Sequence, residues 1–108
     1  MKNEREVKKK IRQGLVDMGL RPAGGKPVAN PSIGWFYMPA NNGMGVSGLP
    51  DFMGIYRGQP FGIEAKGPGG RLSALQADRA SEMQAAGARW FLVDHNNVST
   101  LTEIMEQP

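Results

Sequence analysis

An acidic residue followed thirteen positions later by an acid-x-lysine triplet is the part of this sequence best suited to chemistry. Asp51 precedes the triplet Glu64-Ala65-Lys66, and Gly58-Gln59-Pro60 lies between them. Two carboxylates and one ammonium on a single surface could bind a hard divalent cation, because Mg²⁺ and Mn²⁺ prefer oxygen ligands. The lysine could then stabilise negative charge that develops on a phosphodiester. The spacing therefore predicts a metal-dependent centre that cleaves phosphodiesters.

A hairpin would bring these residues together. Residues 51–57 and 61–66 read as two strands, and Gly58-Gln59 suits a two-residue type II′ turn. In that register Asp51 lies opposite Lys66 and diagonal to Glu64, at about 7–8 Å, on one face of the sheet. The backbone carbonyl of Ala65 could supply a further metal ligand. A slip of one residue would move Asp51 to the other face, and an exposed Asp51–Lys66 ion pair without chemistry is the alternative interpretation.

The remaining elements are predicted from hydrophobic periodicity and turn residues. Val7, Ile11, Leu15 and Met18 recur at helical spacing, which predicts a helix over 4–18. The sequence further predicts a loop over 19–32, a strand over 33–38, a helix over 72–86, a strand over 89–94, a last edge strand over 98–101 and a short helical tail over 101–105. The order α-β-β-β-α-β predicts an α/β fold in which helices flank a small mixed sheet. We expect one domain over residues 1–108.

The charge distribution favours a polyanionic partner. The chain carries a formal net charge of +3, and six of its thirteen Lys and Arg residues lie in the first twelve positions. Such a positive field attracts DNA, although a solvated helix face would look similar. The candidate DNA contacts are Lys8, Lys9, Lys26 and Arg71. The chain contains no cysteine and no apolar run of about 20 residues that could span a membrane, so we expect a cytoplasmic protein.

Several short motifs in the same order resemble a known family. The sequence is similar to the VRR-NUC domain, the virus-type replication-repair nuclease branch of the PD-(D/E)xK superfamily. The resemblance runs from Glu4 to about Asp94 and is carried by Glu4, Gly48-x-Pro50-Asp51, Glu64-Ala65-Lys66, Leu72-Ser73-x-x-Gln76 and Gly87-Ala88. It implies a restriction-endonuclease-like core of the stand-alone phage or bacterial type. It also implies a homodimer that resembles Holliday-junction resolvases.

The resemblance assigns roles residue by residue. It implies that Asp51 and Glu64 bind the metal, that Lys66 is the catalytic lysine, and that Gln76 and Glu4 complete the catalytic set. Gln76 also stands three residues after Ser73, so a helix capping box explains it equally well. Glu4 could simply complement the N-terminus of its helix.

The sequence thus predicts a Mg²⁺- or Mn²⁺-dependent DNA endonuclease that acts on branched DNA such as a four-way junction, in a bacterium or a phage-infected cell. A homodimer would supply the two symmetric cuts that resolving a junction requires. Two alternatives stay open: a nuclease with flap or nicking preference, and a DNA-binding module whose acids are structural.

Overall fold

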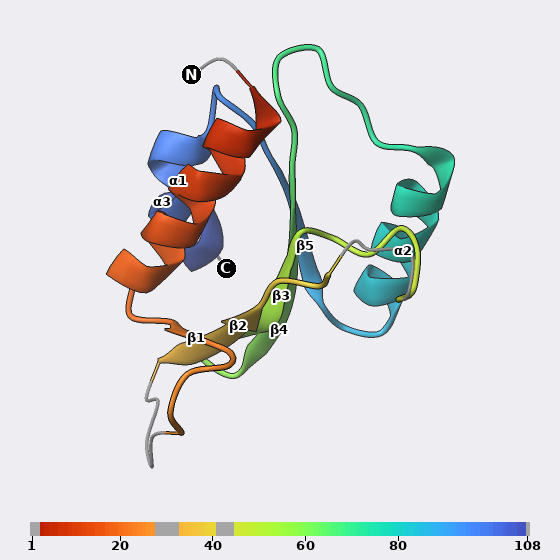
Figure 1. Cartoon of the computed structure of the whole chain (residues 1–108). Helices are drawn as coiled ribbons and strands as arrows, with labels where there is room; N and C mark the ends of the chain where they lie inside the picture. Colours follow the sequence, from red (N-terminus) through yellow and green to blue (C-terminus); the bar gives the residue numbers. More distant parts are fainter. Residues whose placement is uncertain (1–2, 28–32, 41–44, 108) are drawn as a thin grey trace.

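The computed structural model describes residues 3–27, 33–40 and 45–107. A five-stranded sheet forms the middle layer, with α1 and α3 on one face and α2 on the other (Figure 1). The elements in chain order are α1 (Glu4–Asp17), β1 (Arg21–Pro22), β2 (Gly34–Tyr37), β3 (Phe52–Tyr56), β4 (Gln59–Ala65), α2 (Ala74–Ala85), β5 (Arg89–Val93), a 3-10 helix (Val98–Thr100) and α3 (Leu101–Glu106). No helix in these ranges is long and apolar enough to cross a membrane.

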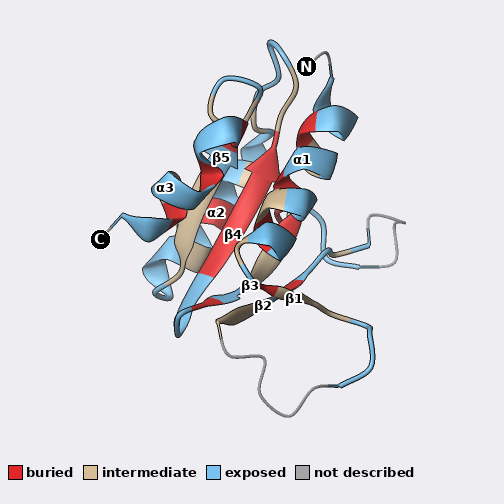
Figure 2. Ribbon diagram, turned by 90° about the vertical axis from the view of Figure 1, so that its left-hand side faces the viewer, coloured by how far each residue is buried: buried red, intermediate tan, exposed pale blue. Residues whose placement is uncertain are grey.

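The sheet is mixed, as predicted. Its strand order is β1-β2-β3-β4-β5, and β3 runs antiparallel to both of its neighbours, β2 and β4. β1 runs parallel to β2, and β5 runs parallel to β4. The β4–β5 pair is connected through α2, because parallel neighbours need a crossover. β4 is the most deeply buried strand (Figure 2), so side chains at its end are removed from water.

Helix α1 packs against the sheet through one apolar stripe. Val7, Ile11 and Leu15 are fully buried, and their spacing of four residues keeps them on one side of the helix. They join a core that includes Phe36 and Phe52. Asn3 caps the helix by accepting a hydrogen bond from the backbone N–H of Glu6 at 2.9 Å. This packing fixes the polar edge of α1 beside the end of β4.

The hairpin turn lies one residue earlier than predicted. Tyr56 pairs with Gln59, so Arg57 and Gly58 form the turn. Both have positive φ, 51° and 80°, which is type I′ geometry and matches the twist of the strands. The predicted Gly58-Gln59 turn of type II′ is therefore wrong. The register differs from the predicted one by two residues, and a shift of two keeps every side chain on its predicted face.

Two further elements differ from the predicted order α-β-β-β-α-β. The segment 21–22 forms the short strand β1 inside the predicted loop, because Arg21 and Pro22 pair with Trp35 and Phe36. The predicted edge strand over 98–101 is wrong. Val98–Thr100 forms a 3-10 turn that leads directly into α3, and it buries Val98 and Leu101 against α1 and the core.

Candidate active site

Two carboxylates meet where β3 begins and β4 ends. The backbone N–H of Asp51 donates to Glu64 Oε1 at 3.2 Å, and Asp51 Oδ2 accepts a hydrogen bond from the N–H of Ala65 at 2.9 Å. Extending the β3–β4 ladder by one residue from Phe52 and Ile63 places Asp51 directly opposite Glu64. The predicted pairing of Asp51 with Lys66 is therefore wrong, and the two acids are closer neighbours than the diagonal arrangement expected from the sequence.

Glu64 is a buried acid held next to another acid. It is the only buried charged residue in the described parts of the chain and is 3% exposed. Burial and the negative charge of the neighbouring Asp51 raise the pKa of Glu64, Lys66 lowers it, and the net result is a pKa of about 7. A carboxylate in this setting gains from a cation that neutralises both charges.

Lys66 supplies one positive charge beside this pair. Its Nζ lies 3.3 Å from Glu64 Oε2 and donates to Gln76 Oε1 at 3.1 Å. The Lys66 side chain is 13% exposed, so the ammonium is largely shielded but still reaches the surface. Because these contacts fix its position, the ammonium could stabilise negative charge on a bound phosphate.

Gln76 links the site to helix α2 and forms the predicted capping box, while its catalytic role stays a prediction. Its Nε2 donates to Glu64 Oε2 at 2.8 Å. Its Oε1 accepts from Lys66 and also from the N–H of Ser73, at 2.9 Å. Ser73 Oγ in turn accepts from the N–H of Gln76, which completes the capping box. The side chain is thus a helix cap and a bridge between the acid and the lysine.

Replacing Gln76 by alanine separates the two roles when it is compared with Ser73→Ala. Both changes break the capping box, which costs about 1 kcal/mol of stability. Only Gln76→Ala also removes hydrogen bonds from Glu64 and Lys66, so we expect it alone to lower cleavage of DNA by about 10- to 100-fold. Thermal unfolding and cleavage rates of both variants check this. Equal cleavage rates for the two variants would show that Gln76 acts only as a helix cap.

Lys8 occupies a position that the sequence did not predict. Its Nζ lies 3.4 Å from Asp51 Oδ1, so the side chain points at the carboxylate pair. Lys9 instead lies on the outer side of α1 with Glu6, Lys10 and Gln13. Arg71 and Lys26 are exposed; Arg71 follows the glycine loop after Lys66, whereas Lys26 belongs to the loop after β1. The structure thus places only Lys8 of the four predicted DNA contacts against the acids.

Glu4 is near the site through its backbone. A Cβ at Gly67 would lie 2.7 Å from the Glu4 nitrogen, so the first turn of α1 packs against the chain just beyond Lys66. Glu4 also precedes Lys8 by four residues and therefore shares its side of the helix. The Glu4 side chain is exposed. Its predicted catalytic role stays a prediction, because no contact joins it to Asp51 or Glu64.

The donor set fits a hard divalent cation that keeps much of its water. Within residues 3–27, 33–40 and 45–107, no three Asp, Glu, His or Cys side chains form a group that could hold a metal. Mg²⁺ is nevertheless commonly bound by one or two carboxylates and several waters. Asp51 and Glu64 supply such a pair. The N–H of Ala65 points toward Asp51, and in a strand the carbonyl of the same residue faces the same neighbour, so Ala65 remains a candidate third ligand.

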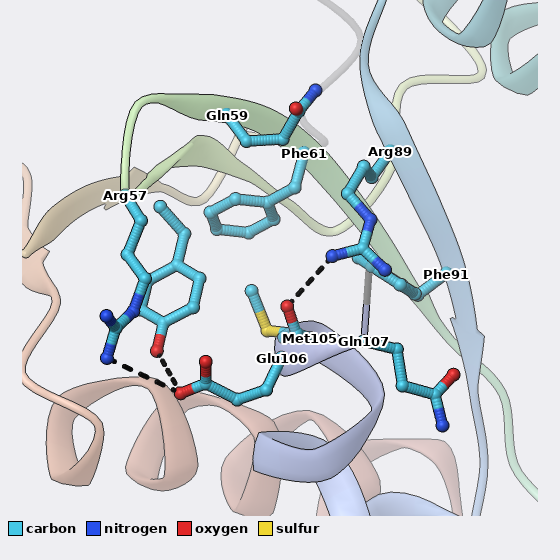
Figure 3. A pocket seen from close by; sticks show the side chains of 9 residues that line it. Arg57, Gln59, Phe61, Arg89, Phe91, Met105, Glu106 and Gln107 are labelled. Carbon is cyan, nitrogen blue, oxygen red and sulfur yellow. Dashed lines mark hydrogen bonds and ion pairs between the residues drawn. The ribbon is translucent and has the colours of Figure 1, made fainter.

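A well-formed cavity lies at the opposite end of the hairpin. It encloses about 230 Å³ between the turn, β5 and α3 (Figure 3). Its charged groups are already paired: Glu106 accepts from the Tyr56 hydroxyl at 2.6 Å and lies 3.7 Å from Arg57, and Arg89 donates to the carbonyl of Met105. These contacts fasten α3 to the sheet, so we assign this cavity to the fold and not to chemistry.

Comparison with known proteins does not add to this geometry. No protein-family model matches the chain, and no curated protein matches it.

Proposed function

We propose that this protein is a metal-dependent DNA endonuclease with a restriction-endonuclease-like core of the VRR-NUC type. The observation that supports the proposal most strongly is the buried Glu64, held beside Asp51 and bridged to Lys66 by Gln76. Burying the Glu64 carboxylate next to the partly exposed Asp51 is costly unless cations offset the two charges. Lys66 pairs with Glu64 and Lys8 pairs with Asp51, so what favours a metal is the direct opposition of two carboxylates of which one is buried.

The residues divide the work of hydrolysis. Asp51 and Glu64 would hold Mg²⁺ or Mn²⁺, which when bound polarises the phosphate and lowers the pKa of a coordinated water. Lys66 would stabilise the negative charge that develops on the phosphate while the bond to the leaving oxygen breaks. Gln76 would position Lys66 and Glu64 relative to each other.

We further propose that the substrate is branched DNA and that the active form is a homodimer in the cytoplasm of a bacterium or a phage-infected cell. One chain holds one site, whereas resolving a four-way junction needs two symmetric cuts, which a two-fold pair would supply. Light scattering under assay conditions tests the dimer, and a monomer that still resolves junctions with paired cuts would contradict it.

The experiment that tests the activity is a cleavage panel. Labelled four-way junction, flap, duplex and single-stranded DNA are incubated with the purified protein in Mg²⁺, Mn²⁺ or EDTA. We expect cleavage of branched DNA with either metal and none in EDTA. Cutting of flaps or nicking alone would favour the flap or nicking alternative. If the protein binds every substrate but cuts none of them in either metal, the proposed nuclease activity is wrong and the alternative of a DNA-binding module is favoured.

A further inference from the structure

Two aromatic side chains lie exposed on the face of the sheet that carries the acids. Trp35 is 43% exposed and Tyr37 is 46% exposed, whereas Phe36 between them is buried in the core. Trp35 pairs with Ile55 and Tyr37 with Met53. Met53 and Ile55 share their face with Asp51, because side chains alternate with period two. The two rings therefore belong to the same surface as the acids.

The two rings lie at increasing distances from the acids, one pair of residues apart along the strand. Met53 follows Asp51 by two residues and Ile55 follows it by four, so Tyr37 and Trp35 lie about 7 Å and 14 Å along the strand from the acids. Successive nucleotides of an extended single strand are spaced by a similar distance. A strand whose phosphate lies at Asp51 and Glu64 could therefore reach both rings with its neighbouring bases.

Basic residues border the outer ring. Arg21 is the direct partner of Trp35 in the β1–β2 pair, at the edge of the sheet farthest from β5 (Figure 1). Arg21, Lys26 and Trp35 line one hollow of about 220 Å³, together with Pro22, Gly24, Gly25 and Pro27. The Arg21 guanidinium donates to the carbonyl of Lys26, which holds the arginine under this loop beside the indole. Proteins bind single-stranded nucleic acid through aromatic rings that stack on the bases and nearby cations that contact the phosphates.

We propose that Arg21, Lys26, Trp35 and Tyr37 form a binding surface for an unpaired stretch of DNA that leads to the carboxylate pair. This surface, the aromatic–basic surface, would stack unpaired bases on Trp35 and Tyr37 and bind phosphates through Arg21 and Lys26. Its connection to cleavage depends on the proposed function, whereas the binding itself does not. It implies that branched DNA with unpaired nucleotides beside the cut is a better substrate than a fully paired four-way junction.

DNA suits this surface better than a second copy of the chain does. A two-fold contact centred on Trp35 would bring the Arg21 and Lys26 of two chains together, and each chain already has a net charge of +3. Like charges that face each other weaken an interface. A polyanion meets the same cations favourably. Paired bases in a duplex already stack on one another, so only unpaired bases would use the rings.

Tryptophan fluorescence tests the binding directly. The chain has two tryptophans, and the buried Nε1 of Trp90 makes no hydrogen bond, so Trp90→Phe leaves Trp35 as the sole probe without breaking one. We expect oligothymidine to quench this emission in EDTA, where no cleavage occurs. In anisotropy titrations with labelled oligothymidine, we expect Trp35→Leu and Tyr37→Leu to weaken binding by roughly 10-fold or more, and Trp35→Phe to stay close to the parent.

The leucine and phenylalanine variants decide between the possible occupants. Ile55→Ala is the control for a loss of exposed apolar area on the same face, since Ile55 is 49% exposed, and it should bind oligothymidine normally. The proposal is overturned if the emission is not quenched, if Trp35→Leu binds as well as Trp35→Phe, or if Trp35→Leu turns a dimer into a monomer in light scattering. Quenching by a protein that cuts no DNA would instead retain this surface and reject the proposed chemistry.

Discussion

Replacing Asp51 by asparagine is expected to lower the rate of DNA cleavage by about 10³-fold and to leave the fold intact. Asparagine is nearly isosteric, and its oxygen can still accept the hydrogen bond from Ala65. What it loses is the charge that would hold a metal. The rate is measured on labelled branched DNA in Mg²⁺, with circular dichroism as the check on folding and anisotropy in EDTA as the check on DNA binding.

Asp78→Asn is the matched control for this change. Asp78 is an exposed acid on helix α2, so its variant removes the same charge from the chain away from the carboxylate pair. Its cleavage rate should remain close to that of the parent protein. An Asp51→Asn variant that cuts DNA as fast as Asp78→Asn would show that Asp51 is not part of the cleavage site.

The stability of the metal-free protein is expected to fall as the pH rises from about 5 to about 8. Glu64 has a pKa of about 7 in the fold and an ordinary pKa near 4.5 when unfolded. Between these values the folded chain binds more protons than the unfolded chain, so stability decreases with rising pH. At 1.36 kcal/mol per pKa unit, the loss approaches about 3 kcal/mol at most. Urea unfolding at fixed pH values measures it.

Two comparisons assign this pH dependence to Glu64. Glu64→Gln cannot ionise at this position, so its stability should lose most of the slope between pH 5 and 8. Contributions from other groups are present in both proteins and cancel in the comparison. Mn²⁺ should stabilise the parent protein more at pH 8 than at pH 5, because the cation binds the ionised carboxylate. An unchanged slope in Glu64→Gln would show that burial does not perturb this acid.

The sequence predicted the elements whose signals are local. The stripe of Val7, Ile11 and Leu15 indicated helix α1, and the two strand-like runs on either side of Gly58-Gln59 indicated the hairpin. Asp51 and Glu64 lie on the same face of the sheet, as predicted, although the predicted turn is wrong. The predicted register differs by two residues, and side chains return to the same face every two residues. The direct opposition of the two acids could not be predicted in that register.

The remaining features depend on distant partners. Arg57 adopts a positive φ in a turn whose side chains contact Glu106 of α3, and no local pattern indicated this pairing. Lys8 was predicted to contact DNA because it lies in a basic run, yet its distance to Asp51 is set by how α1 packs on the sheet. Trp35 and Tyr37 stay exposed because helix α2 covers the part of the same sheet face that lies over β4 and β5, where Met83 packs on Gly62. Their alternation around Phe36 was the one available signal.

Titration of the protein with Mn²⁺ by calorimetry tests most directly whether Asp51 and Glu64 bind a divalent cation. At pH 8 we expect one ion per chain for the parent protein and for Asp78→Asn. We expect Asp51→Asn and Glu64→Gln each to weaken the affinity by more than about 10-fold. Equal affinities in all four proteins, or no Mn²⁺ binding by the parent, would contradict the metal site.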